Sequence, residues 1–321
     1  MKPPYDITPK ILNMIVSISE KLGEINAVHL NKPSPKLRRE NRIKTVQSSL
    51  EIEGNTLSLD QVSAIFDDKK VIGPKKDILE VKNAIEAYNM IGEFDPFSKE
   101  SFCKAHNILM NGLVDSPGKY RRGSVGIIKG KEVMHVAPPG DRVHYLMDEL
   151  FKYLKYDKDA ILIKSCVFHY EAEFIHPFMD GNGRMGRLWQ TVLLRSKYPL
   201  FDYLPVESVI KEKQKEYYEV LAQSDKTGKS TPFIEFMLRI IEIELDRILW
   251  NESKVMSSEE RLNEAKEKFG GKEFSRKEYL RLFKNISTAT ASRDLKSGVD
   301  SGLLLKSGDK RLAVYKFAGK E

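Results

Sequence analysis

The chain has 321 residues, of which 41% are hydrophobic and 31% charged, and its formal net charge is +7. This composition is typical of a globular protein, and the length allows two or three domains. No run of residues is apolar enough to span a bilayer, and the N-terminal segment lacks the apolar core of a signal peptide, so we expect a cytoplasmic protein. Cys103 and Cys166 lie in apolar surroundings without the spacing of metal ligands, which predicts reduced core residues.

The N-terminal third of the chain predicts a series of amphipathic helices. Residues 8–32 have helical apolar spacing and end at the break Pro33-Ser34-Pro35. Ser58 can cap the start of a further helix, and helical spacing recurs over residues 77–92 and 98–113. We expect these segments to form a scaffold that faces the core.

The second helix is expected from about Lys36 towards residue 53. Its apolar stripe consists of Ile43, Val46 and Leu50. The next position on that stripe is Glu53, and a carboxylate on a buried face needs a cationic partner or it takes up a proton. Gly54 is well suited to end the helix.

Two short β-branched runs lie near the middle of the chain. Residues 125–128 and 132–136 flank a turn that contains Gly130, a pattern that predicts a β-hairpin. The simplest interpretation is that the hairpin has a purely structural role.

The stretch from 176 to 187 contains one imidazole, one carboxylate, one amide, three glycines and two arginines. It lies between the helical patterns of residues 160–175 and 188–194, so it is expected to form a tight turn that opens the second of these helices. Gly181 and Gly183 allow consecutive N–H groups to point into one concavity at the helix N-terminus, where anions bind.

The charged residues of this stretch suit a polyphosphate. Arg184 and Arg187 are three residues apart and therefore lie on one face of the helix. Asp180 is an oxygen ligand placed where phosphate-bound magnesium would lie, and His176 can act as a base. These residues predict a nucleotide-phosphate site with a metal and a proton acceptor, without indicating which bond is broken.

Other interpretations of the stretch compete with this one. The GxGxxG pattern of dinucleotide-binding proteins is matched, but no buried strand precedes it, and the P-loop pattern fails because no Gly-Lys-Ser/Thr follows. A transition-metal site of His169, His176 and Asp180 is the next alternative, although His169 has the surroundings of a core histidine. The simplest alternative is a glycine turn with solvated arginines.

The same twelve residues, HPFMDGNGRMGR, resemble the signature HxFx(D/E)GNGRxxR of the Fic family of nucleotidyl transferases and match every specified position. The resemblance covers roughly residues 40–245. It implies that Mg-ATP donates AMP to a Ser, Thr or Tyr hydroxyl of a target protein. The roles it implies are His176 as the base, Asp180 as the Mg2+ ligand, Gly181, Asn182 and Gly183 as the anion hole, Arg184 and Arg187 as ligands of the β- and γ-phosphates, and Gly186 as part of the nucleotide-binding segment.

The resemblance extends to a regulatory segment. Ser49-Leu50-Glu51-Ile52-Glu53-Gly54 resembles the inhibitory motif (S/T)xxxE(G/N) of Fic proteins that have an N-terminal inhibitory helix. It implies that Ser49 and Glu53 are regulatory, and that Glu53 pairs with Arg187 and prevents this arginine from holding the γ-phosphate. The alternative is an ordinary glutamate at a helix end, whereas Glu51 falls off the apolar stripe and is expected to be solvated.

Two further features have counterparts in Fic proteins. The hairpin resembles the flap that docks the target by strand addition, which implies docking roles for Ile128, Val133, Met134 and His135. A helix is expected over 208–223, and its pair Tyr217 and Tyr218 matches the family position that lines the adenine and ribose pocket. Asp225 stands where relatives often carry Asn.

The composition changes after a long amphipathic helix that is expected from Thr231 to Trp250. Residues 251–260 are polar and predict a linker, and residues 251–321 contain 16 Lys/Arg against 11 Asp/Glu. The order that follows is helix 275–283, helix 288–297 and two strands, 303–306 and 312–317. It resembles a winged helix-turn-helix module, whose wing would carry Lys306, Lys310 and Arg311.

The sequence therefore predicts a mainly α fold: a Fic-type helical core with a small β-hairpin flap, and a C-terminal winged helix-turn-helix of the α+β type. The expected domains are 1–95 with the inhibitory helix, 96–250 as the catalytic core, and 251–321. The expected function is protein adenylylation restrained by Glu53, with ATP as substrate and Mg2+ as cofactor. Alternatives are removal of AMP at the same site, transfer of another nucleotide, or a DNA-bound regulator with a nucleotide-sensing core. Expected partners are ATP and a target protein, with DNA and a second copy of the chain as further candidates and no membrane.

Overall fold

The computed structural model describes residues 2–27, 34–123, 126–129, 132–253, 257–283, 286–309 and 313–318. The chain divides into two compact units, Met1–Leu249 and Trp250–Glu321. Helices make up most of the described chain, so the expected mainly α fold class is confirmed. Within the described ranges, no helix is both long and apolar enough to cross a membrane.

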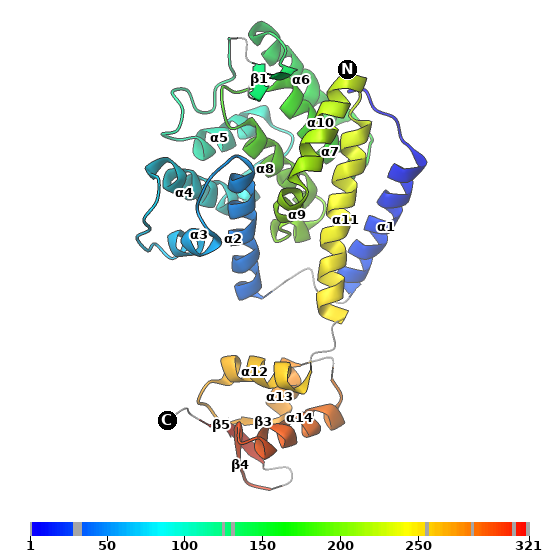
Figure 1. Ribbon diagram of the computed structural model, residues 1–321. Helices are drawn as coiled ribbons and strands as arrows, with labels where there is room; N and C mark the ends of the chain where they lie inside the picture. The colour runs from blue at the N-terminus through cyan, green and yellow to red at the C-terminus, as the bar shows by residue number, and fades with distance from the viewer. Residues whose placement is uncertain are drawn as a thin grey trace. The chain divides into compact units, whose positions relative to one another are not determined.

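In the first unit, helix α1 (Pro9–Ala27) lies alongside α11 (Thr231–Ser253), the blue and yellow helices of Figure 1. Helix α1 buries an apolar face of Ile11, Met14, Ile18, Leu22 and Ile25, and Ile15, which the sequence also predicts on this face, is only partly buried. Polar contacts join the two helices, because Thr8 Oγ1 donates to Glu235 Oε1 at 2.8 Å and Lys21 Nζ donates to Glu242 Oε1 at 2.9 Å. Residues 28–32 of the predicted first helix lie outside the described residues.

The next helices form one side of this unit (Figure 1). They are α2 (Pro35–Ile52), α3 (Leu59–Phe66), α4 (Lys75–Asn89), the 3₁₀ turn η1 (Ile91–Glu93) and α5 (Lys99–Leu109). Helix α2 ends where the sequence predicts, because Glu53 is its C-cap and Gly54 adopts a φ of 92°. The predicted capping box of Ser58 is present, with Gln61 as its partner.

Helices α7 (Ile161–Ile175) and α8 (Asn182–Arg195) form the centre of the unit, with α6 (Gly140–Tyr156) packed on α7. Both central helices are buried on most sides. Gly186 permits their close approach, because a Cβ atom there would lie 2.6 Å from the His169 ring. His169 is fully buried and bonds Gln190 and Tyr217, so its expected place as a core histidine is confirmed.

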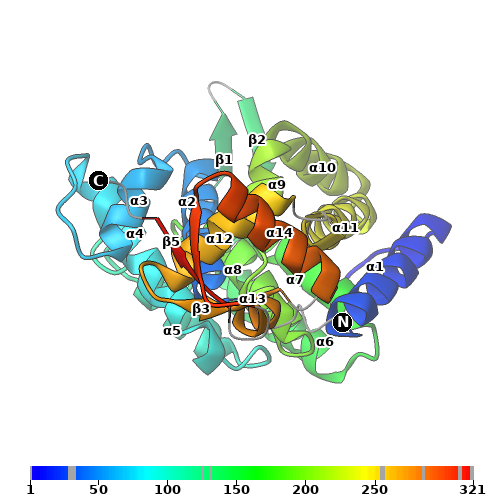
Figure 2. The same ribbon diagram turned by 90° about the horizontal axis from the view of Figure 1, so that it is seen from below.

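The predicted hairpin is confirmed as two antiparallel strands, β1 (Gly126–Lys129) and β2 (Glu132–Val136). The register shifts between Ile127 and Ile128, which marks a bulge or irregularity. In Figure 2 the hairpin projects from the edge of the helical unit. The side chains of residues 124–136 lie outside the described residues, and so do the contacts expected of Ile128, Val133, Met134 and His135.

The predicted single helix over 208–223 is wrong. After the 3₁₀ turn η2 (Pro199–Asp202), the chain forms α9 (Val206–Glu212) and α10 (Gln214–Thr227), which are separated at Lys213. Residues 211–216 contain no helix breaker, so the periodicity could not reveal the break. Packing explains it, because α9 packs on α2 and Gln214 Nε2, at the start of α10, donates to Ile52 O at 3.0 Å.

The second unit has its own small core around Phe274, Tyr279 and Leu295. Its elements are α12 (Ser258–Phe269), β3 (Phe274–Ser275), α13 (Arg276–Leu282), α14 (Thr288–Asp300), β4 (Leu304–Ser307) and β5 (Val314–Phe317), with sheet order β3-β5-β4. Helix α12 corrects the expected linker 251–260, and a buried ion pair between Arg261 and Asp294 holds it to α14. The winged-helix interpretation of this unit stays a prediction.

Buried Glu207 on α9 is expected to make stability depend on pH. Its carboxyl group faces Tyr88, Arg42 and Arg187, and burial raises its pKa from 4.5 to about 7. Because the folded chain then binds this proton more tightly than the unfolded chain does, the stabilisation is complete below about pH 4.5 and is lost as the pH rises through 7. As the pH rises from 5 to 8, the free energy of unfolding of wild type should therefore fall relative to that of Glu207→Gln, by an amount on the order of 2 kcal/mol.

Melting temperatures at pH 5, 6, 7 and 8 measure this effect. Glu171 and Glu244 also have pKa values raised to about 7 by burial, so the variant should keep part of the wild-type trend. Glu219→Gln, on the exposed face of α10, is the matched control and should follow wild type at every pH. A constant difference between Glu207→Gln and wild type across this range would contradict the expectation.

Candidate functional site

The stretch 176–187 forms the turn between α7 and α8 and the first turns of α8. Helix α7 ends at Ile175 and is capped by His176, whose φ of 49° lies in the left-handed region, and Gly181 caps α8 with a φ of 84°. Glycine adopts this conformation without cost, whereas a residue with a side chain needs support from its surroundings. The backbone at His176 is therefore a position that neighbouring groups must hold.

The turn is fixed by hydrogen bonds to its own backbone. The Asn182 side chain accepts from Phe178 N and donates to Phe178 O, both at 2.9 Å. His106 on α5 stacks on the Phe178 ring, accepts from Gly118 N at 2.8 Å and contacts Asp180 O at 3.0 Å through Nε2. Burial lowers the pKa of His106 to about 4, so the ring is neutral and Nε2–H donates to Asp180.

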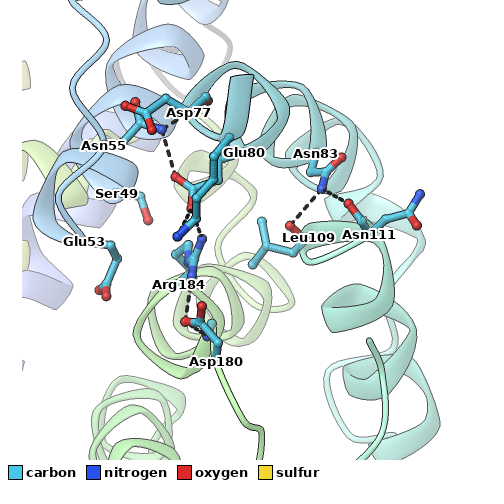
Figure 3. A network of polar contacts seen from close by, with 12 residues as sticks. Ser49, Glu53, Asn55, Asp77, Glu80, Asn83, Leu109, Asn111, Asp180 and Arg184 are labelled. Atoms are coloured by element: carbon cyan, nitrogen blue, oxygen red, sulfur yellow. Dashed lines mark hydrogen bonds and ion pairs between the residues drawn. The ribbon is translucent and has the colours of Figure 1, made fainter. Parts of the chain in front are cut away.

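Arg184 lies between two carboxylates, as Figure 3 shows. Its Nη1 donates to Glu80 Oε1 on α4 at 3.0 Å, and its Nη2 donates to Asp180 Oδ1 at 2.9 Å. Asn55 Nδ2 holds the second oxygen of Glu80 at 2.9 Å. The guanidinium of Arg184 is thus anchored to α4 and directed towards the N-terminus of α8.

Arg187 is fully buried and pairs with Glu53 at the end of α2. Its Nη2 donates to Glu53 Oε1 at 2.7 Å and to Ser49 O at 2.9 Å, and its Nε donates to Ser49 Oγ at 3.1 Å. Burial opposes the charged form, but the Glu53 carboxylate outweighs it and raises the pKa of Arg187. The structure thus brings Arg187 together with Ser49 and Glu53, which precede it in sequence by 138 and 134 residues.

The Glu53 carboxylate also reaches Gly183, in the predicted anion-binding concavity at the N-terminus of α8. A Cβ atom on Gly183 would collide with Glu53 Oε1 and would lie 3.2 Å from Arg187 Nη1. Within the described part of the chain, Nη1 is buried and has no hydrogen-bond partner. An orphaned, buried guanidinium N–H beside backbone amides at a helix N-terminus is a group that an anion can satisfy.

The residues around Asp180 fit a magnesium ion that is shared with a phosphate. Its side chain is 50% exposed, and its Oδ1 accepts from Gly181 N at 2.6 Å and from Arg184. The described residues contain no group of three His, Cys, Asp or Glu that could hold a metal by themselves. Magnesium commonly binds one or two carboxylates together with substrate phosphates and water, which matches a single half-exposed aspartate.

The two neighbouring tyrosines of α10 lie in different surroundings. Tyr217 is buried against Phe233 and Phe236, and its hydroxyl group contacts His169 Nε2 at 3.1 Å. Tyr218 is 39% exposed, and its hydroxyl group donates to Ile52 O at 3.3 Å, next to Glu53. The nucleotide-pocket role of both residues stays a prediction, and the geometry leaves Tyr218 as the accessible one.

Sequence reasoning missed three residues of the site: Glu80, His106 and Arg121. Glu80 and His106 lie on predicted helices, where their burial, at 7% and 1% exposure, is the unusual property. Glu80 lies on the helical face shared with Asn83 and Ala84, so its position near the apolar face was a usable signal. No local pattern could have linked Arg121, which lies outside the helices and strands, to the stretch 176–187.

Glu80→Ala tests how firmly Arg184 depends on its partner. The change leaves a buried guanidinium with one carboxylate less, and we expect the free energy of unfolding to fall by about 3 kcal/mol. Urea denaturation measures it, and Glu86→Ala, at an exposed position of the same helix, should change it by less than about 0.5 kcal/mol. Equal losses for the two variants would show that the Glu80 pair contributes little.

The helical fold, together with the glycine-containing turn and the two arginines at the start of α8, defines a Fic-fold protein. The Fic/DOC family profile matches residues 96–194. The protein adenylyltransferase Fic of Drosophila virilis is 30% identical over 251 residues, which are 74% of this chain and 49% of that protein. The protein of the same name from Aedes aegypti is 32% identical over 240 residues, 70% of this chain and 45% of its own. The chain thus spans about half the length of these relatives.

Solved structures agree with this assignment. A Fic family protein from Desulfovibrio desulfuricans G20 is 40% identical and superposes with a TM-score of 0.79, covering 100% of this chain and 99% of its own. Fic-1 from C. elegans, at 20% identity and a TM-score of 0.63 over 77% of this chain and 74% of its own, shares the fold. The chain belongs to the Fic family.

Proposed function

We propose that the protein transfers AMP from ATP to a Ser, Thr or Tyr hydroxyl group of a target protein, and that Glu53 restrains this activity. The observation that carries the proposal is the position of Arg187, whose unpaired Nη1 lies beside Gly183 while its Nη2 is held by Glu53. The names of the two insect relatives support the same activity.

In the proposed reaction, the acceptor oxygen bonds to the α-phosphorus, the bond from this phosphorus to the bridging oxygen breaks, and pyrophosphate leaves. His176 takes the proton of the attacking hydroxyl group. The backbone N–H groups of residues 181–183, with Arg184 and Arg187, hold the phosphates in place. Magnesium, when bound at Asp180, neutralises phosphate charge. Positioning and charge neutralisation are the main contributions that such a transfer requires.

The proposed restraint follows from the contacts of Glu53. Its carboxylate lies against Gly183 and accepts from Arg187, so it holds negative charge where a terminal phosphate would need the same guanidinium. Two anions cannot share this small volume without strong repulsion. ATP can then bind only with its terminal phosphate elsewhere, which misplaces the α-phosphate for attack.

The experiment compares ATP labelled at the α-phosphate with ATP labelled at the γ-phosphate, each incubated with Glu53→Gly and magnesium. Transfer of AMP predicts protein-bound label from the α-position and none from the γ-position. Label from the γ-position would indicate a kinase, and no label from either would remove the proposed activity. The same assay with α-labelled GTP and CTP tests transfer of another nucleotide, since residues that bind only phosphates do not distinguish one nucleobase from another.

Removal of AMP at the same site is the alternative direction. It would use Glu53 to position a water, so Glu53→Gly would lose the ability to release AMP from a modified protein. A gain in labelling together with unchanged release supports the forward reaction.

We also propose DNA as a candidate partner of the second unit. Helix α14 exposes Arg293 and Lys296 on one face, together with the hydroxyl-bearing Ser297. Basic and hydroxyl side chains on one helix face suit phosphate contacts. A gel-shift titration should show a complex that weakens steeply with salt, and no shift at low salt would exclude DNA binding.

A further inference from the structure

Arg121 is a buried arginine whose side-chain hydrogen bonds to described residues all go to main-chain carbonyl groups. It lies just before the hairpin and is 2% exposed. Its Nε donates to His176 O at 2.7 Å, its Nη1 to Gly123 O at 2.6 Å, and its Nη2 to Pro138 O at 2.6 Å and to Ile175 O at 3.0 Å. One planar guanidinium therefore binds four carbonyl oxygens at once.

Such an arrangement destabilises the folded state unless its geometry serves a function. Within the described ranges, no carboxylate forms an ion pair with Arg121, and burial lowers its pKa. A buried cation that is compensated only by neutral dipoles loses much of its hydration free energy. Lysine could not reproduce the arrangement, because its ammonium group is a single point charge without the rigid fork.

The four acceptors belong to two parts of the site. Ile175 and His176 end α7, where helix carbonyls lack intrahelical partners. Gly123 and Pro138 lie on the two sides of the hairpin formed by β1 and β2. The guanidinium thus connects both ends of the hairpin to the residue that carries the proposed base.

The backbone around His176 depends on the same residue. Arg121 N donates to Pro177 O at 2.8 Å, so Arg121 binds the carbonyl groups of three consecutive residues, 175 to 177. These bonds hold the left-handed conformation of His176, with its φ of 49°. The ends of the hairpin are also closely packed, because a Cβ atom on Gly140 would collide with Arg122 O.

We propose that Arg121 is a positioning residue that holds the hairpin and His176 in a fixed relation, so that an acceptor segment lying along the hairpin meets the imidazole. The inference rests on the proposed function, in which the hairpin docks the target. Nucleotide binding uses the other side of the turn, at residues 181–187. Loss of Arg121 should therefore lower the rate of transfer to protein and leave ATP affinity nearly unchanged.

The test uses Arg121→Lys and Arg121→Gln in the Glu53→Gly background, with Arg122→Gln as the matched control because Arg122 is exposed. We expect both Arg121 variants to label protein about a hundredfold more slowly, as a displacement of about 1 Å can cause. Their dissociation constants for ATP should stay within about twofold of the parent, as one decade corresponds to about 1.4 kcal/mol. Labelling by Arg121→Lys at the parental rate, or a loss of ATP binding that matches the loss of labelling, would overturn the inference.

Hydrogen exchange provides a measurement that does not depend on activity. In both Arg121 variants the peptides covering 123–139 and 175–178 should lose protection together, while α8 keeps its protection and Arg122→Gln behaves like the parent. Protection that stays in either segment would overturn the inference. If the Glu53→Gly parent transfers no label, the proposed function fails, and the exchange result still decides whether Arg121 connects the two segments.

Discussion

Replacement of Glu53 by glycine is expected to raise the rate of AMP transfer from ATP by about 10 to 100-fold. The carboxylate of Glu53 accepts from Arg187 Nη2 at 2.7 Å, and its removal frees this guanidinium for a phosphate. The backbone should tolerate the change, because Glu53 is the C-cap of α2 and glycine is favoured at helix ends. Incorporation of α-labelled ATP into protein, at saturating magnesium, measures the effect.

Glu51→Gly is the matched control, since it removes a carboxylate from the same helix two residues earlier. Glu51 contacts Lys211 and Gln47 and none of the arginines of the site. Its replacement by glycine costs helix stability, about 1 kcal/mol, without releasing Arg187. If Glu51→Gly activates as strongly as Glu53→Gly, loosening of α2 and not the ion pair would account for the activation.

Replacement of His176 by alanine, in the Glu53→Gly background, is expected to reduce AMP transfer by about a thousandfold. The proposed reaction needs a proton acceptor at the end of α7, and no other side chain of the stretch 176–187 is a suitable base, because Asp180 is engaged by Arg184 and Gly181. The rate of labelling from α-labelled ATP gives the effect, and ATP affinity should stay within about threefold.

His144→Ala is the control for the histidine replacement, because His144 is exposed on α6 and its ring packs against Tyr120. It should label at the parental rate. Labelling by His176→Ala within tenfold of its parent would show that another group, or water, accepts the proton.

The parts of the fold that sequence could predict are those with a local cause. The stripe of Ile43, Val46 and Leu50 predicted Glu53 as the next position on a buried face, but the Glu53 side chain is 31% exposed because it lies at the C-cap of α2. Its partner Arg187 was named by the resemblance and not by the stripe. The hairpin and the capping box of Ser58 likewise follow from nearby residues. In each case the deciding pattern lies within a few turns of the chain.

The parts that sequence could not predict depend on contacts between distant segments. The break at Lys213 is set by packing of α9 and α10 on α2, and residues 211–216 show no sign of it. Helix α12 has a local signal in the capping box of Ser257 and Glu260, but the segment is rich in charge, and the burial of Leu262 and Ala265 in the core of the second unit depends on distant residues. Glu80 and Arg121 have roles that depend on partners 104 and 55 residues away.

The competition between Glu53 and a terminal phosphate for Arg187 can be observed directly in crystal structures of wild type and Glu53→Gly, each bound to a non-hydrolysable ATP and magnesium. In the variant, the terminal phosphate should contact Arg187 beside Gly183, and the α-phosphate should face His176. In wild type, Glu53 should keep its bond to Arg187 and the terminal phosphate should lie elsewhere. The same phosphate position in both structures, with Glu53 still bonded to Arg187, would contradict the account.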